Sequence, residues 1–211
     1  MKRNLFIAMA CLVGIASFAQ KKGDMLVSGS FMADFGIYKT SSSIKENSAS
    51  EFSPFSSEYS IDAGYGCFVA DNVRLGARLS VPIYSYPTIK DGDKWLKDRV
   101  ISVDVVPHVA YYLKLADKFY YTPEVGAVFS WGRTKSQWDP SETIVTPITA
   151  WGVYINLIAF EYKVTDNIAL GATLGGPAYF RVTEKYADET VKMDQLLFDC
   201  SGTTLSFNYY F

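Results

Sequence analysis

The chain has 211 residues, of which 49% are hydrophobic and 16% aromatic, and its formal net charge is −2. This length fits one compact unit, because two ordinary domains would each be small. Lys and Arg total 20 against 22 Asp and Glu and form no basic stripe, so the chain lacks the charge pattern of a nucleic-acid-binding protein. Its many aromatic residues favour pleated strands and membrane interfaces.

The first twenty residues, MKRNLFIAMACLVGIASFAQ, have the pattern of a secretory signal peptide. Two cations follow the initiator Met, and the apolar run from Leu5 to Ile15 is shorter than the roughly 20 residues that a spanning helix needs. Ser17-Phe18-Ala19 provides small residues at a cleavage site. We therefore predict a signal peptide over residues 1–19, cleaved near Ala19, and a mature domain over residues 20–211.

The chain has three cysteines. Cys11 lies in the signal segment, where lipid attachment is the alternative interpretation, although the sequence after it stays apolar and ends in a better cleavage site. Cys67 and Cys200 would reach a compartment that permits disulfides, but they fall at different heights of the predicted strands, and we expect no bridge. Each stands alone, so the sequence predicts no metal site and no cofactor.

Apolar and polar residues alternate with a period of two through the rest of the chain, which indicates strands and no amphipathic helix. Eight such runs can be marked, and each could hold the roughly 9–11 residues that a transmembrane strand needs. The runs cover residues 25–38, 55–69, 73–86, 99–114, 119–132, 148–164, 168–182 and 195–211.

The connections between these runs are alternately short and long. ADNVRLGA (70–77), LADKFYYT (115–122) and TDNIALGA (165–172) contain the short turns, where Asp and Asn suit tight reversals. The other four connections are longer and polar. Short periplasmic turns and long external loops are typical of outer-membrane barrels. The sequence therefore predicts an all-β fold, an eight-stranded antiparallel transmembrane β-barrel with up-and-down meander topology.

Aromatic residues fall near the ends of the predicted strands, as in the two girdles of a lipid-facing barrel. A soluble sandwich with an aromatic core is the alternative. The predicted girdle residues are Trp131 and Trp151 on the long-loop side, and Tyr111, Tyr121, Tyr162, Tyr209 and Phe211 on the short-turn side. Within residues 148–164 the alternation changes parity, and we expect a β-bulge near Ile158 and Ala159 rather than a wrong register.

Several charged residues alternate with the apolar positions and should face the barrel interior. Eight strands leave an interior just wide enough for side chains, so we expect a buried ion-pair network. A selectivity lining or a proton path is the functional alternative. The predicted interior residues are Asp34, Glu58, Asp62, Arg74, Arg78, Asp104, His108, Glu124 and Arg181, joined by Glu161 if the bulge exists.

Two further features bear on function. His108 is the one histidine of the chain, so a lipid-modifying enzyme would have a single histidine base, and no serine stands beside it on the outward face. In the long loops, Trp95 and Trp138 lie among charged residues, where exposed aromatic side chains suit a ligand or partner. The alternative is that these two rings pack on each other or on lipid headgroups.

The chain ends LSFNYYF, with Leu205, Phe207, Tyr209 and Phe211 alternating. This ending resembles the C-terminal signal that the outer-membrane assembly machinery recognises. With GYGCFVADNVRLG (64–76) and TDNIALG (165–171), it makes the whole mature chain resemble the outer-membrane protein β-barrel domain family, the porin-like small barrels of the OmpA and OmpX type. The resemblance implies an integral barrel and brings no catalytic residues.

From these features we expect a non-enzymatic protein in the outer membrane of a Gram-negative cell. It would present four surface loops for envelope structure, adhesion or binding. A narrow porin-like channel for small solutes is the alternative, and a lipid-modifying enzyme is a weaker one. The expected partners are outer-membrane lipid, the assembly machinery through Phe211, and an extracellular ligand or host surface.

Overall fold

A computed structural model of the chain describes residues 21–36, 39–41, 50–52, 56–91, 94–139, 142–186, 189–199 and 203–211. The predicted signal peptide, residues 1–19, lies outside them, as does Cys200. Among the residues described, no helix has the length and apolar character needed to cross a membrane.

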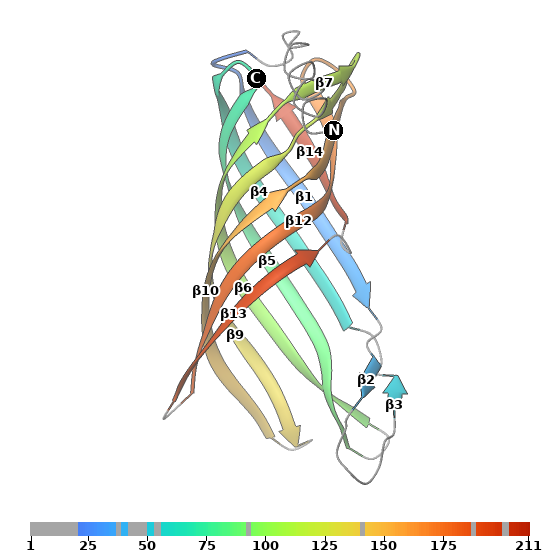
Figure 1. Ribbon diagram of the computed structural model, residues 1–211, viewed down its shortest axis with the longest axis vertical. Coiled ribbons are helices and arrows are strands. Elements are labelled where there is room, and N and C mark those ends of the chain that lie inside the picture. The colour runs from blue at the N-terminus through green and yellow to red at the C-terminus, as the bar shows by residue number, and fades with distance from the viewer. Residues whose placement is uncertain are drawn as a thin grey trace, which may run out of the picture.

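Eight long strands form one closed antiparallel ring, in the order β1-β4-β5-β6-β9-β10-β12-β14 and back to β1 (Figure 1). The ring closes because Leu26–Ala33 of β1 pair with Thr203–Tyr210 of β14. The predicted eight-stranded barrel is therefore confirmed. The strands are β1 (Met25–Gly36), β4 (Ser56–Ala70), β5 (Val73–Asp91), β6 (Lys94–Tyr111), β9 (Glu124–Asp139), β10 (Glu142–Asn156), β12 (Ile168–Lys185) and β14 (Thr203–Tyr210).

Further strands extend the ring at its two ends. Near the short turns, β7 (Leu113–Ala116) pairs with β8 (Phe119–Tyr121), and β8 pairs with β11 (Ile158–Lys163). At the opposite end, β13 (Thr190–Asp199) pairs with β12, and β2 (Lys39–Ser41) forms a separate ribbon with β3 (Ser50–Phe52). Four of the predicted runs are thus each built from two successive strands.

The short turns lie together on one rim. Asn72 (φ 64°) and Lys118 (φ 61°) adopt the left-handed conformation, which Asn tolerates well in tight reversals. The C-terminus is on this rim, where the amide of Phe211 donates to the carbonyl of Met25 at 3.0 Å. The long hairpins, including β5–β6, point to the other end (Figure 1).

The predicted bulge is confirmed. The register shifts between Ile158 and Ala159, at the break between β10 and β11. A second irregularity lies opposite, in β12: Ala159 pairs with Thr173 but Ile158 pairs with Gly175, so Leu174 has no partner. Gly175 has a φ of 94°, a conformation that side chains disfavour. The paired bulges change which residues face inward on both strands.

This second bulge makes the prediction for Arg181 wrong. Arg181 pairs with Trp151, whose ring points out from the barrel, and its guanidinium carbon lies 5.8 Å from that ring centre. Its Nε and Nη2 atoms donate to the carboxylate of Asp194 on β13, at 2.6 and 2.9 Å. Arg181 is therefore outside the barrel, because the bulge at Gly175 reverses the alternation that the sequence alone implied.

The outer wall is apolar. Residues at outward positions of β5 and β6, such as Leu79 and Val103, are exposed, while their sequence neighbours point inward. Among the predicted girdle residues, Tyr121 is half-buried and its hydroxyl donates to the carbonyl of Leu157 at 2.6 Å. The others are exposed on the outer wall: Trp131, Trp151, Tyr111, Tyr162, Tyr209 and Phe211.

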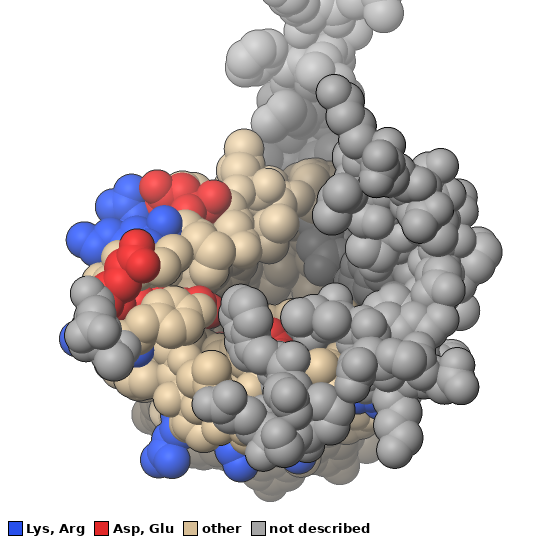
Figure 2. Space-filling view, turned by 90° about the horizontal axis from the view of Figure 1, so that it is seen from below, with Lys and Arg blue, Asp and Glu red and all other residues tan. Residues whose placement is uncertain are grey.

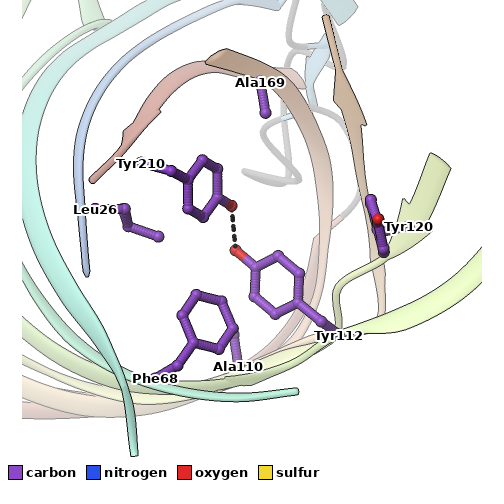
Figure 3. Packing of buried hydrophobic residues seen from close by; sticks show 7 residues of the cluster. All are labelled: Leu26, Phe68, Ala110, Tyr112, Tyr120, Ala169 and Tyr210. Carbon is purple, nitrogen blue, oxygen red and sulfur yellow. Dashed lines mark hydrogen bonds between the residues drawn. The ribbon is translucent and has the colours of Figure 1, made fainter. Parts of the chain in front are cut away.

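The hydrophobic core sits inside the barrel at the short-turn end (Figure 3). The rings of Phe68 and Tyr112 meet edge to face with centres 5.1 Å apart, and Tyr210 reaches toward them from β14. We call this cluster the plug; its members are Leu26, Phe68, Ala110, Tyr112, Tyr120, Ala169 and Tyr210. Seen from the long-hairpin end, the molecule is hollowed (Figure 2).

Candidate functional site inside the barrel

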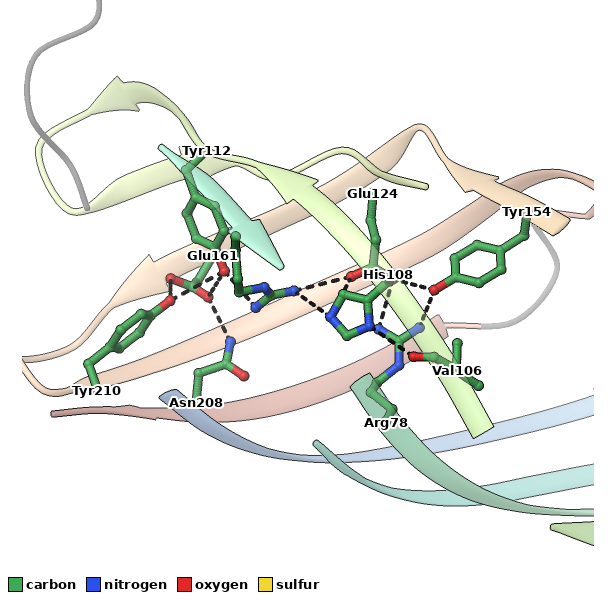
Figure 4. Close-up of polar contacts among 10 residues, drawn as sticks. Arg78, Val106, His108, Tyr112, Glu124, Tyr154, Glu161, Asn208 and Tyr210 are labelled. Carbon is green, nitrogen blue, oxygen red and sulfur yellow. Dashed lines mark hydrogen bonds and ion pairs between the residues drawn. The ribbon is translucent and has the colours of Figure 1, made fainter. Parts of the chain in front are cut away.

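Next to the plug, Glu124 of β9 lies at the centre of a buried ionic cluster (Figure 4). Its Oε1 accepts from the Nη1 of Arg78 at 2.8 Å and from the hydroxyl of Tyr154 at 2.7 Å. Its Oε2 accepts from the Nη2 of Arg74 at 3.1 Å. One carboxylate thus serves two guanidinium groups that reach it from β5.

His108 of β6 completes this cluster. Its Nδ1 faces the carbonyl of Val106 at 3.1 Å, and a carbonyl can only accept, so Nδ1 carries the proton. Its Nε2 is then free to accept from the Nη2 of Arg74, at 3.5 Å, and lies 3.6 Å from Glu124. The imidazole therefore acts here as a packing and hydrogen-bonding element of the network.

A second buried carboxylate, Glu161 of β11, lies closer to the short turns. It accepts from the hydroxyl of Tyr210 and from the side-chain amide of Asn208, both at 2.6 Å. The hydroxyl of Tyr112 lies 3.4 Å from it and also accepts from the Nη1 of Arg74 at 2.7 Å. Tyr112 therefore joins the two carboxylates into one network across the interior.

The network is close to electrically balanced. Two guanidinium groups, of Arg74 and Arg78, face the two carboxylates of Glu124 and Glu161. Unpaired charges inside a barrel would cost several kcal/mol each, about what is lost when one partner of a buried pair is removed. Pairing therefore stabilises the interior only as long as every member is present.

Glycines on neighbouring strands make room for the large polar side chains. A Cβ added at Gly76 would lie 2.6 Å from the Nε2 of His108, and one at Gly126 would lie 2.6 Å from the hydroxyl of Tyr154. These glycines pair in register with the residues they accommodate. A side chain at either position would push the network out of its geometry.

Gly76→Ala should therefore lower the free energy of unfolding by about 1–3 kcal/mol, the usual cost of overpacking. The measurement is urea unfolding in detergent micelles, followed by tryptophan fluorescence. Gly29→Ala is the control, because an added Cβ there would meet only a backbone oxygen at 3.9 Å. Equal midpoints for the two variants would show that His108 does not need the space beside Gly76.

The other predicted interior acids lie along the wall toward the long hairpins. Asp62 accepts from the hydroxyl of Ser30 at 2.7 Å, and Asp104 accepts from that of Ser102 at 2.9 Å. Asp34 and Glu58 are cross-strand neighbours on β1 and β4. The structure thus brings Arg74, Arg78, His108 and Glu124 together, and it places these four acids nearer to the long hairpins.

Tyr154, Asn208 and Tyr210 belong to the network but were not among the predicted interior residues. The signal was present, because each alternates with an outward aromatic or apolar residue: Tyr154 with Val153, and Tyr210 with Tyr209. A tyrosine at an inward position of a narrow barrel needs a hydrogen-bond partner for its hydroxyl. Counting inward tyrosines beside inward charges would have found them.

Cavities lie inside the barrel, beside the network and between it and the long hairpins. A polar one of about 120 Å³ adjoins Glu124 and Glu161. A larger one of about 340 Å³ opens toward the long hairpins and is lined mainly by apolar side chains of several strands, among them Val100, Ile148, Phe180 and Leu197. The long-hairpin half of the interior is thus hollow, and we call it the cup. Its closed end, formed by the ionic network, is polar, and its wall is partly apolar.

No arrangement for metal binding occurs among the described residues, in which no three His, Cys, Asp or Glu side chains converge. His108 is 5% exposed and points inward, away from the outer face where a lipid substrate would approach. Cys67 is a free thiol in β4. The described charged groups of the interior therefore form a buried ion-pair network around Glu124.

The two tryptophans predicted in loops lie in strands. Trp95 is in β6 and Trp138 in β9, because the hairpins continue as paired strands beyond the predicted ends. The prediction that they lie in loops is therefore wrong. Their side chains are outside the described part of the structure, so their predicted role in contacts stays a prediction.

An eight-stranded antiparallel barrel with an apolar outer wall, aromatic rims and an ionic interior defines the class of small outer-membrane β-barrel proteins. The chain has this architecture, and its exposed apolar belt requires a lipid environment. The protein thus has the fold of a small outer-membrane β-barrel.

Among the solved structures that are similar to this chain, OprG shares its fold. The outer membrane protein OprG from Pseudomonas aeruginosa matches with a TM-score of 0.54 at 14% identity, over 91% of this chain and 97% of that chain. The attachment invasion locus protein Ail of Yersinia pestis matches with a TM-score of 0.41 at 12% identity, over 90% and 99%. Neisserial surface protein A matches with a TM-score of 0.35 at 17% identity, over 90% and 96%. No family model matches the chain, and no curated protein matches it.

Proposed function

We propose that the protein is a non-enzymatic outer-membrane barrel that is closed at its periplasmic end. It would act through the cup and the long hairpins at its outer end, in envelope structure, adhesion or binding. The observation that carries this proposal is the continuous network from Arg78 through Glu124 and Tyr112 to Glu161, lying beside the plug. Together they occupy the interior where a pore would have to pass.

The aromatic residues at both rims support the orientation. Trp131 and Trp151 would lie at the outer lipid interface, and Tyr162, Tyr209 and Phe211 at the periplasmic one. In this orientation the C-terminal strand, with Phe211 at its end, faces the side from which the assembly machinery would recognise it. The long hairpins would then meet any extracellular ligand or host surface.

Planar-bilayer conductance tests the closed end. The refolded chain should show heat-modifiable gel mobility, the sign of a folded barrel, but no steady unitary currents, because side chains fill an eight-stranded interior. Steady currents from a preparation with a complete mobility shift would overturn the proposal and favour a channel. Absence of a mobility shift would argue against the barrel itself.

One observation favours a second candidate function. The cavity of about 340 Å³ in the outer half has a partly apolar lining that includes Phe180 and Met193, and its size would suit a small apolar solute. Binding there would be the first step of a narrow channel if the network could move aside. Saturable binding of a small aromatic compound, lost in Phe180→Glu and retained in Leu79→Ala on the outer wall, would support this candidate.

A further inference from the structure

A groove crosses the outer wall of the barrel between β6 and β9. It has a volume of about 560 Å³ and lies on the long-hairpin side of Trp131. Its lining includes the cations Arg99, Arg133 and Lys135 and the apolar residues Ile101, Val103 and Trp131. One end of the groove is therefore basic and the other end is apolar.

The register fixes how close the cations lie. Arg99 stands directly opposite Lys135, and Arg133 is opposite Ile101, one step further toward Trp131. All three side chains are exposed and alternate with buried or half-buried inward residues such as Thr134. Like charges directly opposite on neighbouring strands destabilise the pair, so this arrangement calls for an anion that lies between them.

No acid whose side chain is described provides that anion. Among the outward positions of β5, β6, β9 and β10 whose side chains the structure describes, none is Asp or Glu, and Asp98 and Asp104 of β6 alternate with Arg99 and Val103 and so belong to the inner face. No ion pair joins the three cations to a described residue. Arg181, also on the outer wall, is different, because Asp194 already holds it in a two-bond pair.

The height of the cations fits a lipid headgroup. Arg133 follows Trp131 by two residues, or about 7 Å along a strand, on the side away from the apolar belt. An aromatic ring at this place marks the interface, and headgroup phosphates lie just outside it. Figure 2, from the long-hairpin end, shows Lys and Arg on the outer circumference of the molecule.

We propose that this groove binds the phosphate of an acidic outer-leaflet lipid. The guanidinium groups of Arg99 and Arg133 and the ammonium of Lys135 would hold the phosphate oxygens, for which Arg offers paired donors. An acyl chain of the same lipid would lie over Val103 and Trp131. The site is on the outer wall and so is independent of whether the barrel interior conducts.

The test measures lipid binding to the refolded chain in uncharged detergent micelles by native mass spectrometry. The probe is diphosphorylated lipid A, compared with its dephosphorylated form. The triple variant R99Q/R133Q/K135Q should bind it on the order of a hundredfold more weakly, since each cation near an anionic headgroup contributes about fivefold. R181Q is the matched control and should bind like the unchanged chain, because Arg181 is already paired.

Further measurements distinguish binding of a lipid phosphate from binding of free inorganic phosphate. Inorganic phosphate at millimolar concentration should not displace lipid A, whereas full displacement would mean that the groove binds the ion and not the lipid. Equal binding of the dephosphorylated form, or an unchanged affinity of the triple variant, would overturn the proposal. Heat-modifiable mobility checks folding, and the single variant R133Q, expected to lose about fivefold, serves if the triple variant does not fold.

Discussion

Replacing Glu124 by glutamine should lower the free energy of unfolding by about 3–5 kcal/mol, the cost of breaking a buried ion pair from one side. The substitution keeps the size of the side chain and removes its charge. Arg74 and Arg78, held at 3.1 and 2.8 Å by this carboxylate, would remain in the interior with no charge partner beside them. Urea unfolding in micelles, followed by tryptophan fluorescence and gel mobility, measures the loss.

The control for this variant is Asp194→Asn. Asp194 also binds a guanidinium group through two bonds, at 2.6 and 2.9 Å, but on the outer wall, where more than half of its side chain is exposed. An exposed pair contributes little to stability, because water and salt screen its charges. If both variants lost the same stability, burial of Glu124 inside the barrel would not matter and the interior network would not stabilise the protein.

The same reasoning predicts that Arg78→Leu lowers the free energy of unfolding more than Lys97→Leu on the outer wall.

Removing two rings of the plug should turn a silent barrel into a conducting one. In the double variant F68A/Y112A, the edge-to-face pair near the short-turn rim is lost, together with the hydroxyl that bridges Arg74 and Glu161. We expect steady unitary currents in planar bilayers. We also expect a loss of stability of roughly 3–5 kcal/mol for each ring, as for other buried aromatic residues.

Tyr111→Ala separates this effect from a general weakening of the barrel. Tyr111 is the sequence neighbour of Tyr112, but its ring is on the outer wall and 36% exposed, against 2% for Tyr112. It should leave the conductance at zero. Currents of the same size from Tyr111→Ala would mean that leakage comes from a loosened wall. A folded double variant without currents would show that the ionic network alone seals the interior.

Much of the fold could be predicted because a barrel repeats one rule. Period-two alternation and the alternation of short and long connections indicated eight strands, and the parity change in residues 148–164 located the bulge at Ile158 and Ala159. The compensating bulge at Gly175 was not predicted. Its extra residue falls within a stretch of small residues whose alternation is weak, and Arg181 was placed on the wrong face as a result.

The candidate site could be predicted only as a set of inward charges. Alternation gives the face of each residue, so Arg74, Arg78, His108 and Glu124 were placed inside. It does not give the height at which residues of distant strands meet, and so the pairing with Glu124 needed the register. The contribution of tyrosine hydroxyls was missed, because an aromatic residue in a strand was weighed as an apolar one.

The pairing of β14 with β1 both closes the ring of strands and completes the hydrogen bonds to Glu161. β14 is the last strand of the chain, and it carries Asn208 and Tyr210, two of the donors to Glu161. Until β14 docks against β1 and β12, the nascent barrel has open edges and a carboxylate without these partners. A chain that ended before Thr203 would therefore lack both the pairing that closes the ring and two hydrogen-bond donors to Glu161.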